Sequence, residues 1–348
     1  MLLSLKTYIV YPFMIRLAID AMGGDNSPSV VVNGAVAAAR HLNVRLALVG
    51  QPKKIEDCLA IHPDWKTVGI EIVPAADVID MADQPAAALR RKPLASIRVA
   101  IDLVAKGKAD AVFSAGNTGA TVIAAHAAFG MIPGVGRPAL ATTIPTTEQP
   151  AVLLDAGAST ECRAEHLLQF GLMGSVYARL ALGVKNPRIG LLSIGEEETK
   201  GNELTRDAYH QLKTSPVEFI GSVEARDVYR GVADVIVCDG FTGNVVLKVS
   251  EGLVEAVELL LEDELKGTFS SQVGYLLSQR AFRRFRKRVD YSEYGGAPLM
   301  GVAGLAVVGH GRSSVKAIRN AIVMAYRFVS TDFVKRVEEE VSITVQSK

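Results

Sequence analysis

The segment GKADAVFSAGNTGAT, residues 107–121, aligns without gaps with GVADVIVCDGFTGNV, residues 231–245. In each segment a short apolar run predicts a buried strand, and the G-x-T-G sequence after it predicts a turn into a helix. Glycine permits such a turn, and the first turn of the helix offers N–H groups to an anion. A single turn of this kind is equally typical of an ordinary strand–helix junction, whereas two matching turns favour anion binding.

Around these two segments, short apolar runs alternate with helical patterns through most of the chain. Strands are predicted at residues 15–20, 45–50, 70–74, 109–116, 151–157, 188–195, 233–240 and 304–311. Helices are predicted at residues 94–106, 118–130, 163–183, 202–213 and 314–329. This alternation is typical of an α/β fold with three layers, α/β/α, around a mostly parallel sheet. We therefore predict a single α/β domain over residues 15–348, preceded by an N-terminal extension over residues 1–14.

The composition argues against several classes of protein. Lys and Arg number 38 against 37 Asp and Glu, a formal charge of +1, which does not favour nucleic acid as a partner. Cys58, Cys162 and Cys238 show no zinc-binding spacing and are predicted to be buried thiols in a reducing, cytosolic compartment. No apolar stretch reaches the roughly 18–20 residues of a transmembrane helix. Walker A and G-x-G-x-x-G motifs are missing from the sequence, which weakens a nucleotide-binding interpretation.

Residues 250–290 break the alternation, because two helical patterns follow each other with no strand between them. The apolar side of the first helix consists of Leu253, Val257, Leu260, Leu261 and Leu265. The turn region 267–277 is apolar and the second helix is basic, which is typical of a hairpin resting on an anionic membrane or an acidic partner. Packing in a dimer is the alternative, and both can hold. The expected contact residues are Phe269, Val273, Leu276, Leu277, Arg280, Arg283, Arg284, Arg286 and Lys287.

Polar residues and glycines follow several predicted strands, which is where ligands bind in such sheets. After the first strand, Asp20 and Asp25 are suited to orient a hydroxyl, hold a metal or cap the helix that follows Pro28. Lys200 lies in an acidic loop, where it is the expected anion contact, held in place by glutamates. A solvated acidic loop is the alternative.

Two further strand ends carry candidate residues. A helix beginning near Gly243 places Asn244 and Lys248 on one face, so that Lys248 is expected to reach back toward the strand ends. His310 lies between glycines, where it is suited to proton transfer or anion binding, with a structural role as the alternative. Ser314 is expected to cap the helix over residues 314–329.

The motifs DAMGGD, SAGNTGA, LLSIGEEETKGN, VCDGFTGNVVLK and DYSEYGGAPLMGV…HGRS occur in an order that resembles the bacterial phosphate acyltransferases of the PlsX family. The resemblance implies a fold like that of isocitrate and isopropylmalate dehydrogenases and phosphotransacetylases. It implies transfer of a fatty acyl group from acyl carrier protein to inorganic phosphate, an early step of phospholipid synthesis, with no cofactor. A homodimer is implied as well. The hairpin is implied to face the inner side of the cell membrane, where a glycerol-3-phosphate acyltransferase takes the product.

The residues and the resemblance together predict attack of phosphate on a thioester carbonyl without an acyl-enzyme. The expected catalytic residues are Lys200 and Lys248, which neutralise charge, and His310 or Asp239, which manages the proton. Phosphate or acyl binding is expected at Asp20, Gly23, Gly24, Gly116, Asn117, Thr118, Gly119, Asn202, Gly240, Thr242, Gly243, Asn244, Gly296 and Arg312. No residue is assigned to a metal.

The chain departs from the family pattern at two serines, and three other functions are alternatives. The family has Asn where this chain has Ser159 and Ser222, so neither serine is assigned a catalytic role. A phosphotransacetylase-like enzyme using acyl-CoA is one alternative. A dehydrogenase dependent on NAD and a metal is another, with Asp20, Asp155 and Asp239 as ligands. A scaffold without catalysis would rest on the hairpin alone and leave the strand-end motifs unexplained.

Overall fold

The computed structural model describes residues 14–289 and 295–346, without the side chains of residues 267, 269, 286–288 and 344–346. The chain divides into two compact parts, the first comprising residues 1–133 and 295–339 and the second residues 134–294 and 340–348. The predicted extension over residues 1–14 lies outside the described residues except for Met14. A single domain over residues 15–348 stays a prediction, because a division into compact parts does not establish how the parts fold.

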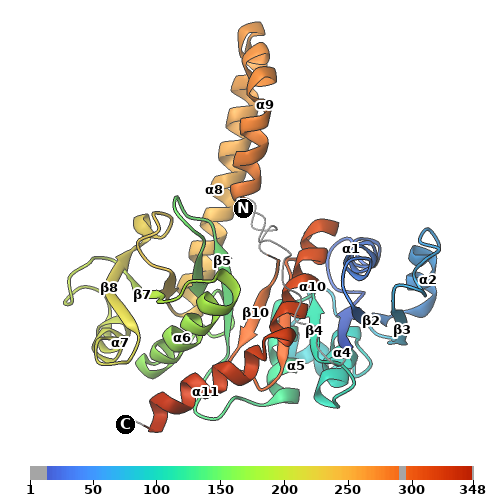
Figure 1. Cartoon of the computed structure of the whole chain (residues 1–348), viewed down its shortest axis with the longest axis horizontal. Coiled ribbons are helices and arrows are strands. Elements are labelled where there is room, and N and C mark those ends of the chain that lie inside the picture. The colour runs from blue at the N-terminus through green and yellow to red at the C-terminus, as the bar shows by residue number, and fades with distance from the viewer. Residues whose placement is uncertain (1–13, 290–294, 347–348) are drawn as a thin grey trace. The chain divides into compact units, whose positions relative to one another are not determined.

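The first part contains six strands in the order β3-β2-β1-β4-β11-β10 (Figure 1). All pairs are parallel except β10 with β11. The strands are β1 (Ile15–Asp20), β2 (Val44–Gly50), β3 (Ile70–Pro74), β4 (Ala111–Ser114), β10 (Ala297–Met300) and β11 (Leu305–Val308). The helices are α1 (Ser29–Ala39), α2 (Pro52–Leu59), α3 (Pro85–Arg91), α4 (Ser96–Ala105), α5 (Thr118–Phe129) and α10 (Val315–Ser330), followed by α11 (Phe333–Gln346).

The second part contains five strands in the order β5-β6-β9-β7-β8, parallel except for β5 with β6. The strands are β5 (Ala139–Ile144), β6 (Ala151–Leu154), β7 (Arg188–Ser193), β8 (Glu218–Glu224) and β9 (Val235–Val237). The helices are α6 (Ala164–Tyr177), α7 (Glu203–Lys213), α8 (Gly240–Gly267) and α9 (Phe269–Val289). A π-helical turn (Ala178–Leu182) extends α6, and a 3₁₀ turn (Ala225–Asp227) follows β8.

The continuously apolar segments of the sequence form the central strands of the sheet. Every residue of β4, β6, β9 and β11 is buried, as expected for central strands whose two faces are both covered by helices. In the first part, α1 packs against α10 and α4 packs against α5, and both pairs contact the sheet. The predicted mostly parallel α/β fold with flanking helices is confirmed.

The segment predicted as a hairpin differs from the prediction in two respects. The helix α8 begins at Gly240 rather than near Gly243, directly after the strand end, and runs unbroken to Gly267. The expected apolar turn over residues 267–277 is wrong, because α9 already begins at Phe269 and only Thr268 separates the two helices. The apolar and basic residues of this segment recur with helical spacing, which favours a helix over a loop.

Candidate functional site

In the first part, the parallel strands β1, β4 and β11 end beside one another. Asp20 closes β1 and is only 2% exposed, and its Oδ2 accepts a hydrogen bond of 2.6 Å from Ser114 Oγ at the end of β4. A Cβ at Gly23 would lie 2.6 Å from Asp20 Oδ2 and 2.7 Å from Gly116 N, so glycine is required there. Burial raises the pKa of Asp20 against the opposing effect of its hydrogen bonds. Asp20 therefore orients the Ser114 hydroxyl, and its predicted contact with substrate stays a prediction.

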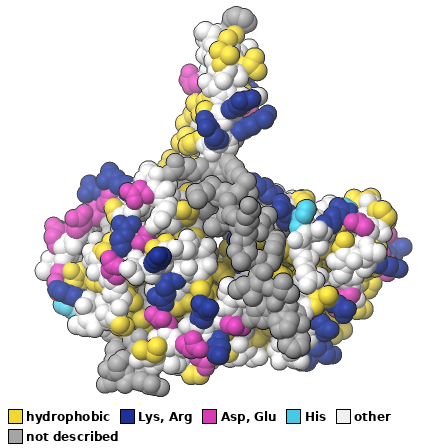
Figure 2. Space-filling view, viewed as in Figure 1, with side chains coloured by type: hydrophobic (Ala, Val, Ile, Leu, Met, Phe, Trp, Pro, Cys, Tyr) yellow, Lys and Arg dark blue, Asp and Glu magenta, His cyan; other side chains and the backbone are white. Residues whose placement is uncertain are grey.

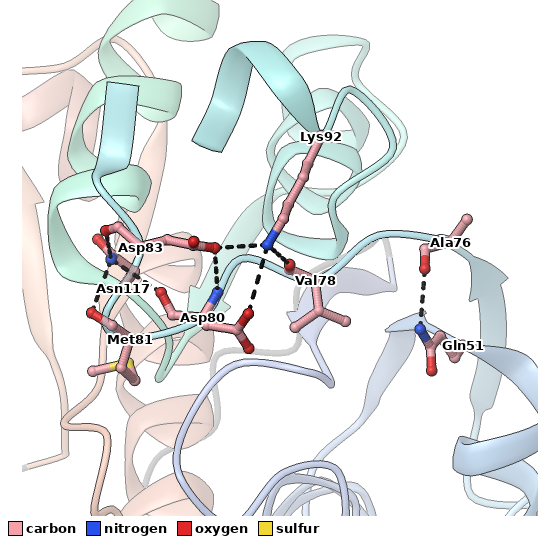
Figure 3. A network of polar contacts seen from close by, with 8 residues as sticks. All are labelled: Gln51, Ala76, Val78, Asp80, Met81, Asp83, Lys92 and Asn117. Atoms are coloured by element: carbon pink, nitrogen blue, oxygen red, sulfur yellow. Dashed lines mark hydrogen bonds and ion pairs between the residues drawn. The ribbon is translucent and has the colours of Figure 1, made fainter. Parts of the chain in front are cut away.

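Asn117 caps α5 and holds a neighbouring loop at the same time (Figure 3). Its Oδ1 accepts a hydrogen bond of 3.0 Å from the N–H of Ala120. Its Nδ2 donates to the carbonyl oxygens of Asp80, Met81 and Asp83 at 3.3, 3.2 and 3.0 Å. Both ends of the side-chain amide are therefore engaged within the protein.

Lys92 fastens the same loop from the other side (Figure 3). Its Nζ donates to the carbonyl oxygen of Val78 at 2.7 Å and to Asp83 Oδ2 at 2.6 Å. Met81 reaches the turn after β11, since a Cβ at Gly311 would lie 2.9 Å from Met81 Cε. The loop over residues 78–83 thus lies against the His310 turn.

The turn after β11 places His310 half-buried and Arg312 exposed. His310 Nδ1 accepts a hydrogen bond of 3.2 Å from the N–H of Arg312, so the neutral ring carries its proton on Nε2. The N–H of Asp25 donates to the carbonyl oxygen of Gly311 at 2.9 Å and joins this turn to the loop after β1. The predicted cap by Asp25 is not seen, because α1 follows Pro28 with no side-chain cap.

Two other glycines of this region are explained by close packing. Gly24 has a φ of +107°, which side-chain-bearing residues rarely adopt. A Cβ at Gly296 would lie 2.7 Å from the carbonyl oxygen of Val308. The backbone alone therefore demands glycine at both positions, and their predicted contact with substrate stays a prediction.

In the second part, the buried carboxylate of Asp155 lies just after β6. Its Oδ1 accepts hydrogen bonds from the N–H groups of Leu140, Gly157 and Ala158 at 2.8, 2.9 and 2.9 Å. Its Oδ2 accepts one of 2.7 Å from the N–H of Ser159. Burial raises the pKa of Asp155, and these four bonds oppose the rise. The carboxylate fastens both β5 and its own following loop to the end of β6.

Asp239 caps α8 at the end of β9. Its two carboxylate oxygens accept hydrogen bonds from the N–H and the hydroxyl of Thr242 at 2.9 and 2.7 Å. The N–H of Gly240 donates to the carbonyl oxygen of Ser159 at 2.8 Å, and a Cβ at Gly240 would lie 2.6 Å from Asp155 Oδ2. This junction therefore packs onto the Asp155 loop.

The next turns of α8 carry Asn244 and Lys248, which are both exposed. Lys248 Nζ donates to Glu251 Oε2 at 2.8 Å, one turn further along the helix. The expected reach of Lys248 back toward the strand ends is therefore not seen. A Cβ at Gly243 would overlap the carbonyl oxygen of Asp155, so this glycine lets the helix approach the loop.

The loop after β7 carries Lys200 and Asn202, which are exposed. Asn202 caps α7, because its Oδ1 accepts a hydrogen bond of 2.9 Å from the N–H of Thr205. Glu198 forms an ion pair of 3.0 Å with Lys213 instead of Lys200. No ion pair of Lys200 is found within residues 14–289 and 295–346, and the prediction that glutamates hold it is wrong.

The helical hairpin of α8 and α9 exposes apolar and basic side chains. On α9, Val273, Leu276 and Leu277 are 43%, 67% and 81% exposed. Arg280, Arg283 and Arg284 are exposed as well, and Figure 2 shows hydrophobic groups near the tip with basic groups below them. The side chains of Phe269, Arg286 and Lys287 lie outside the description. Of the helices described, none is long and apolar enough to cross a membrane.

Among the described residues, neither a metal-binding cluster nor a thiol with a lowered pKa is found. Within the described part of the chain, no group of three or more His, Cys, Asp or Glu is arranged to hold a metal. Burial, followed by the charges of Asp155 and Asp239, raises the pKa of Cys162 to about 12. Burial raises the pKa of Cys238 well above its usual value. Cys238 is buried as predicted, whereas Cys58 and Cys162 are only half-buried.

The sequence interpretation missed Arg137, and gave Asp155 no part beyond a metal ligand. Arg137 lies just before β5, and because β5 runs antiparallel to β6, its start lies beside the end of β6. Its positive charge lowers the pKa of Cys162, although burial outweighs it. In the sequence, Arg137 could have been found only by recognising that a strand, β5, follows it. The two threonines within that strand and the prolines on either side interrupt its apolar pattern.

Ser159 has a structural role that its sequence context did not reveal. Its Oγ donates to the carbonyl oxygen of Pro138 at 2.8 Å, and its N–H bonds to Asp155. Ser222 lies within β8, opposite Leu191 in the register. The contacts of Ser159 hold the start of β5 to the loop after β6, whereas Ser222 is placed only by its strand register.

Solved structures identify the fold. A phosphotransacetylase from Streptococcus pyogenes aligns with a TM-score of 0.59 at 15% identity, covering 91% of this chain and 94% of that chain. A 4-hydroxythreonine-4-phosphate dehydrogenase from Klebsiella pneumoniae aligns with a TM-score of 0.50 at 14% identity, covering 91% and 99%. The fold is thus the one that phosphotransacylases share with this dehydrogenase, as predicted.

The sequence places the chain more narrowly. The pattern of a family described as "Fatty acid synthesis protein" matches residues 15–336. A phosphate acyltransferase of Heliobacterium modesticaldum is 49% identical over 326 residues, covering 94% of this chain and 97% of that protein. The chain belongs to this family of acyltransferases, and the predicted family membership is confirmed.

Proposed function

We propose that the protein transfers a fatty acyl group from acyl carrier protein to inorganic phosphate, giving acyl phosphate and the free carrier thiol. The observation that carries this proposal is the 49% identity to a phosphate acyltransferase over 97% of that protein's length. The fold shared with phosphotransacetylases supports it, because these proteins show that such a sheet is compatible with acyl transfer to phosphate.

The chemistry needs positioned charge more than a nucleophilic side chain. A phosphate oxygen attacks the thioester carbonyl, and the tetrahedral oxyanion expels a thiolate whose conjugate acid has a pKa of about 8.5. Such a leaving group needs little proton assistance, so donors to phosphate and oxyanion supply most of the rate. The raised pKa of Cys162, about 12, disfavours an acyl-cysteine intermediate.

The two strand–helix junctions are suited to different parts of this reaction. The N-terminus of α5 has a neutral cap, Asn117, and the N–H groups of Thr118 and Gly119 belong to its first turn. Such N–H groups have no intrahelical acceptor and favour an anion. The N-terminus of α8 already holds the carboxylate of Asp239. Phosphate therefore binds at α5, and Asp239 manages a proton.

Other predicted residues fit this division of roles. Lys200 is exposed and lacks an ion pair among the described side chains, so it meets an anionic substrate at lower cost than Lys248, which is bound to Glu251. His310, with its proton on Nε2, is suited to donate to a phosphate or leaving group. Asn202, Thr242, Asn244 and Arg312 remain expected substrate contacts.

The hairpin supports the proposed partners. The exposed Leu276 and Leu277 suit an apolar membrane interior, and the exposed arginines suit anionic lipids or an acidic carrier protein. We place the protein in the cytoplasm as a homodimer at the inner face of the membrane. There its product passes to a membrane glycerol-3-phosphate acyltransferase.

The first test gives the purified protein palmitoyl-acyl carrier protein with and without phosphate and traps acyl phosphate as the hydroxamate. Phosphate-dependent product is expected, and none from a folded protein would overturn the proposal. Palmitoyl-CoA in place of the carrier donor distinguishes a phosphotransacetylase-like enzyme.

Single-turnover rates of three variants test the residue roles. His310→Ala and Lys200→Ala are expected to lower the rate about 10²-fold, the loss typical of one charge-stabilising donor. Lys248→Ala is the matched control, with a loss below about tenfold. Near-parental rates for His310→Ala and Lys200→Ala would remove these two assignments.

A further inference from the structure

The loop over residues 78–83 lies between β3 and α3 in the chain and is held by side chains. Two contacts close it on itself. The N–H of Asp83 donates to the carbonyl oxygen of Asp80 at 3.1 Å, and the N–H of Asp80 donates to Asp83 Oδ2 at 3.0 Å. Lys92 and Asn117 bond to it from outside (Figure 3). The position of the loop against α5 therefore depends on these two side chains.

Lys92 also compensates the negative charge of this loop. Its Nζ lies 2.6 Å from Asp83 Oδ2 and 3.6 Å from Asp80 Oδ2. The side chains of Lys92 and Asp83 are 29% and 22% exposed, so solvent screens this ion pair only in part. The hydrogen bond from Lys92 lowers the pKa of Asp83, which is therefore ionised at neutral pH. Without Lys92, the loop would carry two uncompensated carboxylates beside the helix end at which phosphate is proposed to bind, and like charges repel.

Asn117 connects the loop to the first turn of α5. Its Nδ2 shares two hydrogens among three carbonyl oxygens of the loop, and its Oδ1 accepts the N–H of Ala120. The loop also reaches the turn that carries His310, because a Cβ at Gly311 would lie 2.9 Å from Met81 Cε. One loop thus contacts both the cap of α5 and the His310 turn.

We propose that Lys92 is a positioning residue for phosphate: by fixing the loop over residues 78–83, it holds the N-terminus of α5 and the His310 turn at the spacing that the anion requires. The inference rests on the proposed function, since that function places phosphate at this end of α5. Lys92 acts indirectly, because its N–H groups already face acceptors of the loop itself.

Steady-state kinetics of Lys92 variants test this role. Lys92→Met removes the charge and both hydrogen bonds but keeps an unbranched side chain. We expect the KM for phosphate to rise about tenfold, the effect of one lost charge-assisted hydrogen bond, and the KM for palmitoyl-acyl carrier protein to change less than about twofold. Lys92→Arg keeps the charge and is expected to restore the KM for phosphate to within about threefold of the parent. An unchanged KM for phosphate in Lys92→Met, or equal increases for both substrates, would overturn the proposal.

Lys106→Met is the matched control. Lys106 Nζ donates to Asp102 Oδ2 at 3.2 Å, so the same substitution removes an ion pair of the same kind. Lys106 lies between α4 and the start of β4, at the opposite edge of the sheet from Asn117, which follows the end of β4. This variant is expected to leave both KM values within about twofold of the parent. An increase in the KM for phosphate as large as that of Lys92→Met would mean that any lost positive charge has this effect, and would overturn the proposal.

Asn117→Ser tests whether Lys92 acts through the cap of α5. Serine caps helices about as well as asparagine but has no amide to bond to the loop. This variant is expected to raise the KM for phosphate about tenfold, and its combination with Lys92→Met to add no more than about twofold, because both break the same connection. An additive increase of about a hundredfold would show that the two residues act independently, and would overturn the proposal.

Thermal unfolding with inorganic phosphate separates failure of this role from failure of the proposed function. A ligand that binds only the folded protein raises its thermal midpoint by mass action. Lys92→Met is expected to need about tenfold more phosphate than the parent or Lys106→Met for the same rise, whatever its own midpoint without phosphate. This result without acyl phosphate from any donor would overturn the proposed function alone. An equal phosphate requirement in a protein that does form acyl phosphate would overturn the role of Lys92 alone.

Discussion

The two matching segments, residues 107–121 and 231–245, form strand–helix junctions that differ in where the helix begins. In the first, Asn117 caps α5, which begins at Thr118. In the second, Asp239 caps α8, which begins at Gly240, two positions earlier in the alignment. The residue aligned with Asn117 is Phe241, which is 65% exposed. One sequence pattern thus yields a neutral cap in one part and an acidic cap in the other.

The difference in the caps changes the electrostatics of the two helix ends. A helix N-terminus carries about half a positive charge, which a carboxylate cap compensates and an amide cap leaves in place. The junction at α5 therefore remains attractive to phosphate, whereas the junction at α8 already holds its anion. Repeated glycines indicate close backbone packing in both, and the cap residue decides what each can bind.

Apart from their caps, the two junctions have the same arrangement of neighbouring aspartates. Each packs onto a buried aspartate at the end of a neighbouring strand, Asp20 or Asp155. Each strand is preceded by an aspartate that accepts the N–H of an arginine. Asp110 accepts from Arg16 at 2.7 Å and Asp234 from Arg188 at 2.9 Å.

The largest expected difference between the junctions concerns the last glycine of each G-x-T-G. A methyl group at Gly243 would overlap the Asp155 carbonyl oxygen, whereas at Gly119 its nearest neighbour is the Pro85 ring, at 2.7 Å. Backbone yields less easily than a side chain. Gly243→Ala should therefore lower the free energy of unfolding by about 3 kcal/mol and Gly119→Ala by about 1 kcal/mol. Urea denaturation followed by far-ultraviolet circular dichroism measures both, and equal losses would mean that the junctions are packed alike.

Most of the fold was predictable, because central parallel strands are continuously apolar. β1 and β3 match their predicted limits, and the other predicted strands overlap observed ones. The strands β5, β8 and β10 were missed for physical reasons. β8 has mostly exposed or half-buried residues, and β10 begins directly after two glycines and has Pro298 at its second position.

Less of the site was predictable, because side-chain partners come from elements distant in the sequence. The motif identified Asn117 as a functional candidate. The hydrogen bonds of Asn117 to the loop over residues 78–83 could not be predicted, because that loop carries no recognisable motif. Likewise, Lys248 was assigned by helical spacing alone, and spacing does not reveal that Glu251 is the partner in range.

A smaller difference is expected between the two buried aspartates. Asp155 accepts only backbone N–H groups, which cannot reverse their direction. Asp20 Oδ2 accepts from the hydroxyl of Ser114, which can rotate to meet an amide. Asp155→Asn should therefore cost about 2 kcal/mol, since one buried N–H loses its acceptor, and Asp20→Asn about 1 kcal/mol.

Thermal and urea unfolding of the two asparagine variants give the comparison. Asp155→Ala is the reference for full loss, with a larger effect than Asp155→Asn. A greater cost at Asp20 than at Asp155 would contradict the division between rotatable and fixed donors.

A third difference, of similar size at pH 7 but smaller at low pH, concerns the aspartates before the strands. Asp234 is bound by the Arg188 side chain and by Gln149, whereas Asp110 is exposed. Burial raises the pKa of Asp234, but the bonds and charge of Arg188, with Gln149, outweigh it and hold the pKa below the usual 3.8. The ionised pair therefore stabilises the fold above pH 3.8, and this stability is lost as the pH falls through the lower folded-state pKa.

Asp234→Asn should lower the free energy of unfolding by about 1.5 kcal/mol at pH 7. This is less than the loss expected for a fully buried ion pair, because Arg188 is partly exposed. Asp110→Asn should cost less than about 0.5 kcal/mol. Urea midpoints from pH 7 to pH 3 measure both, and a cost at Asp234 that does not shrink toward pH 3 would show that the ion pair is not its source.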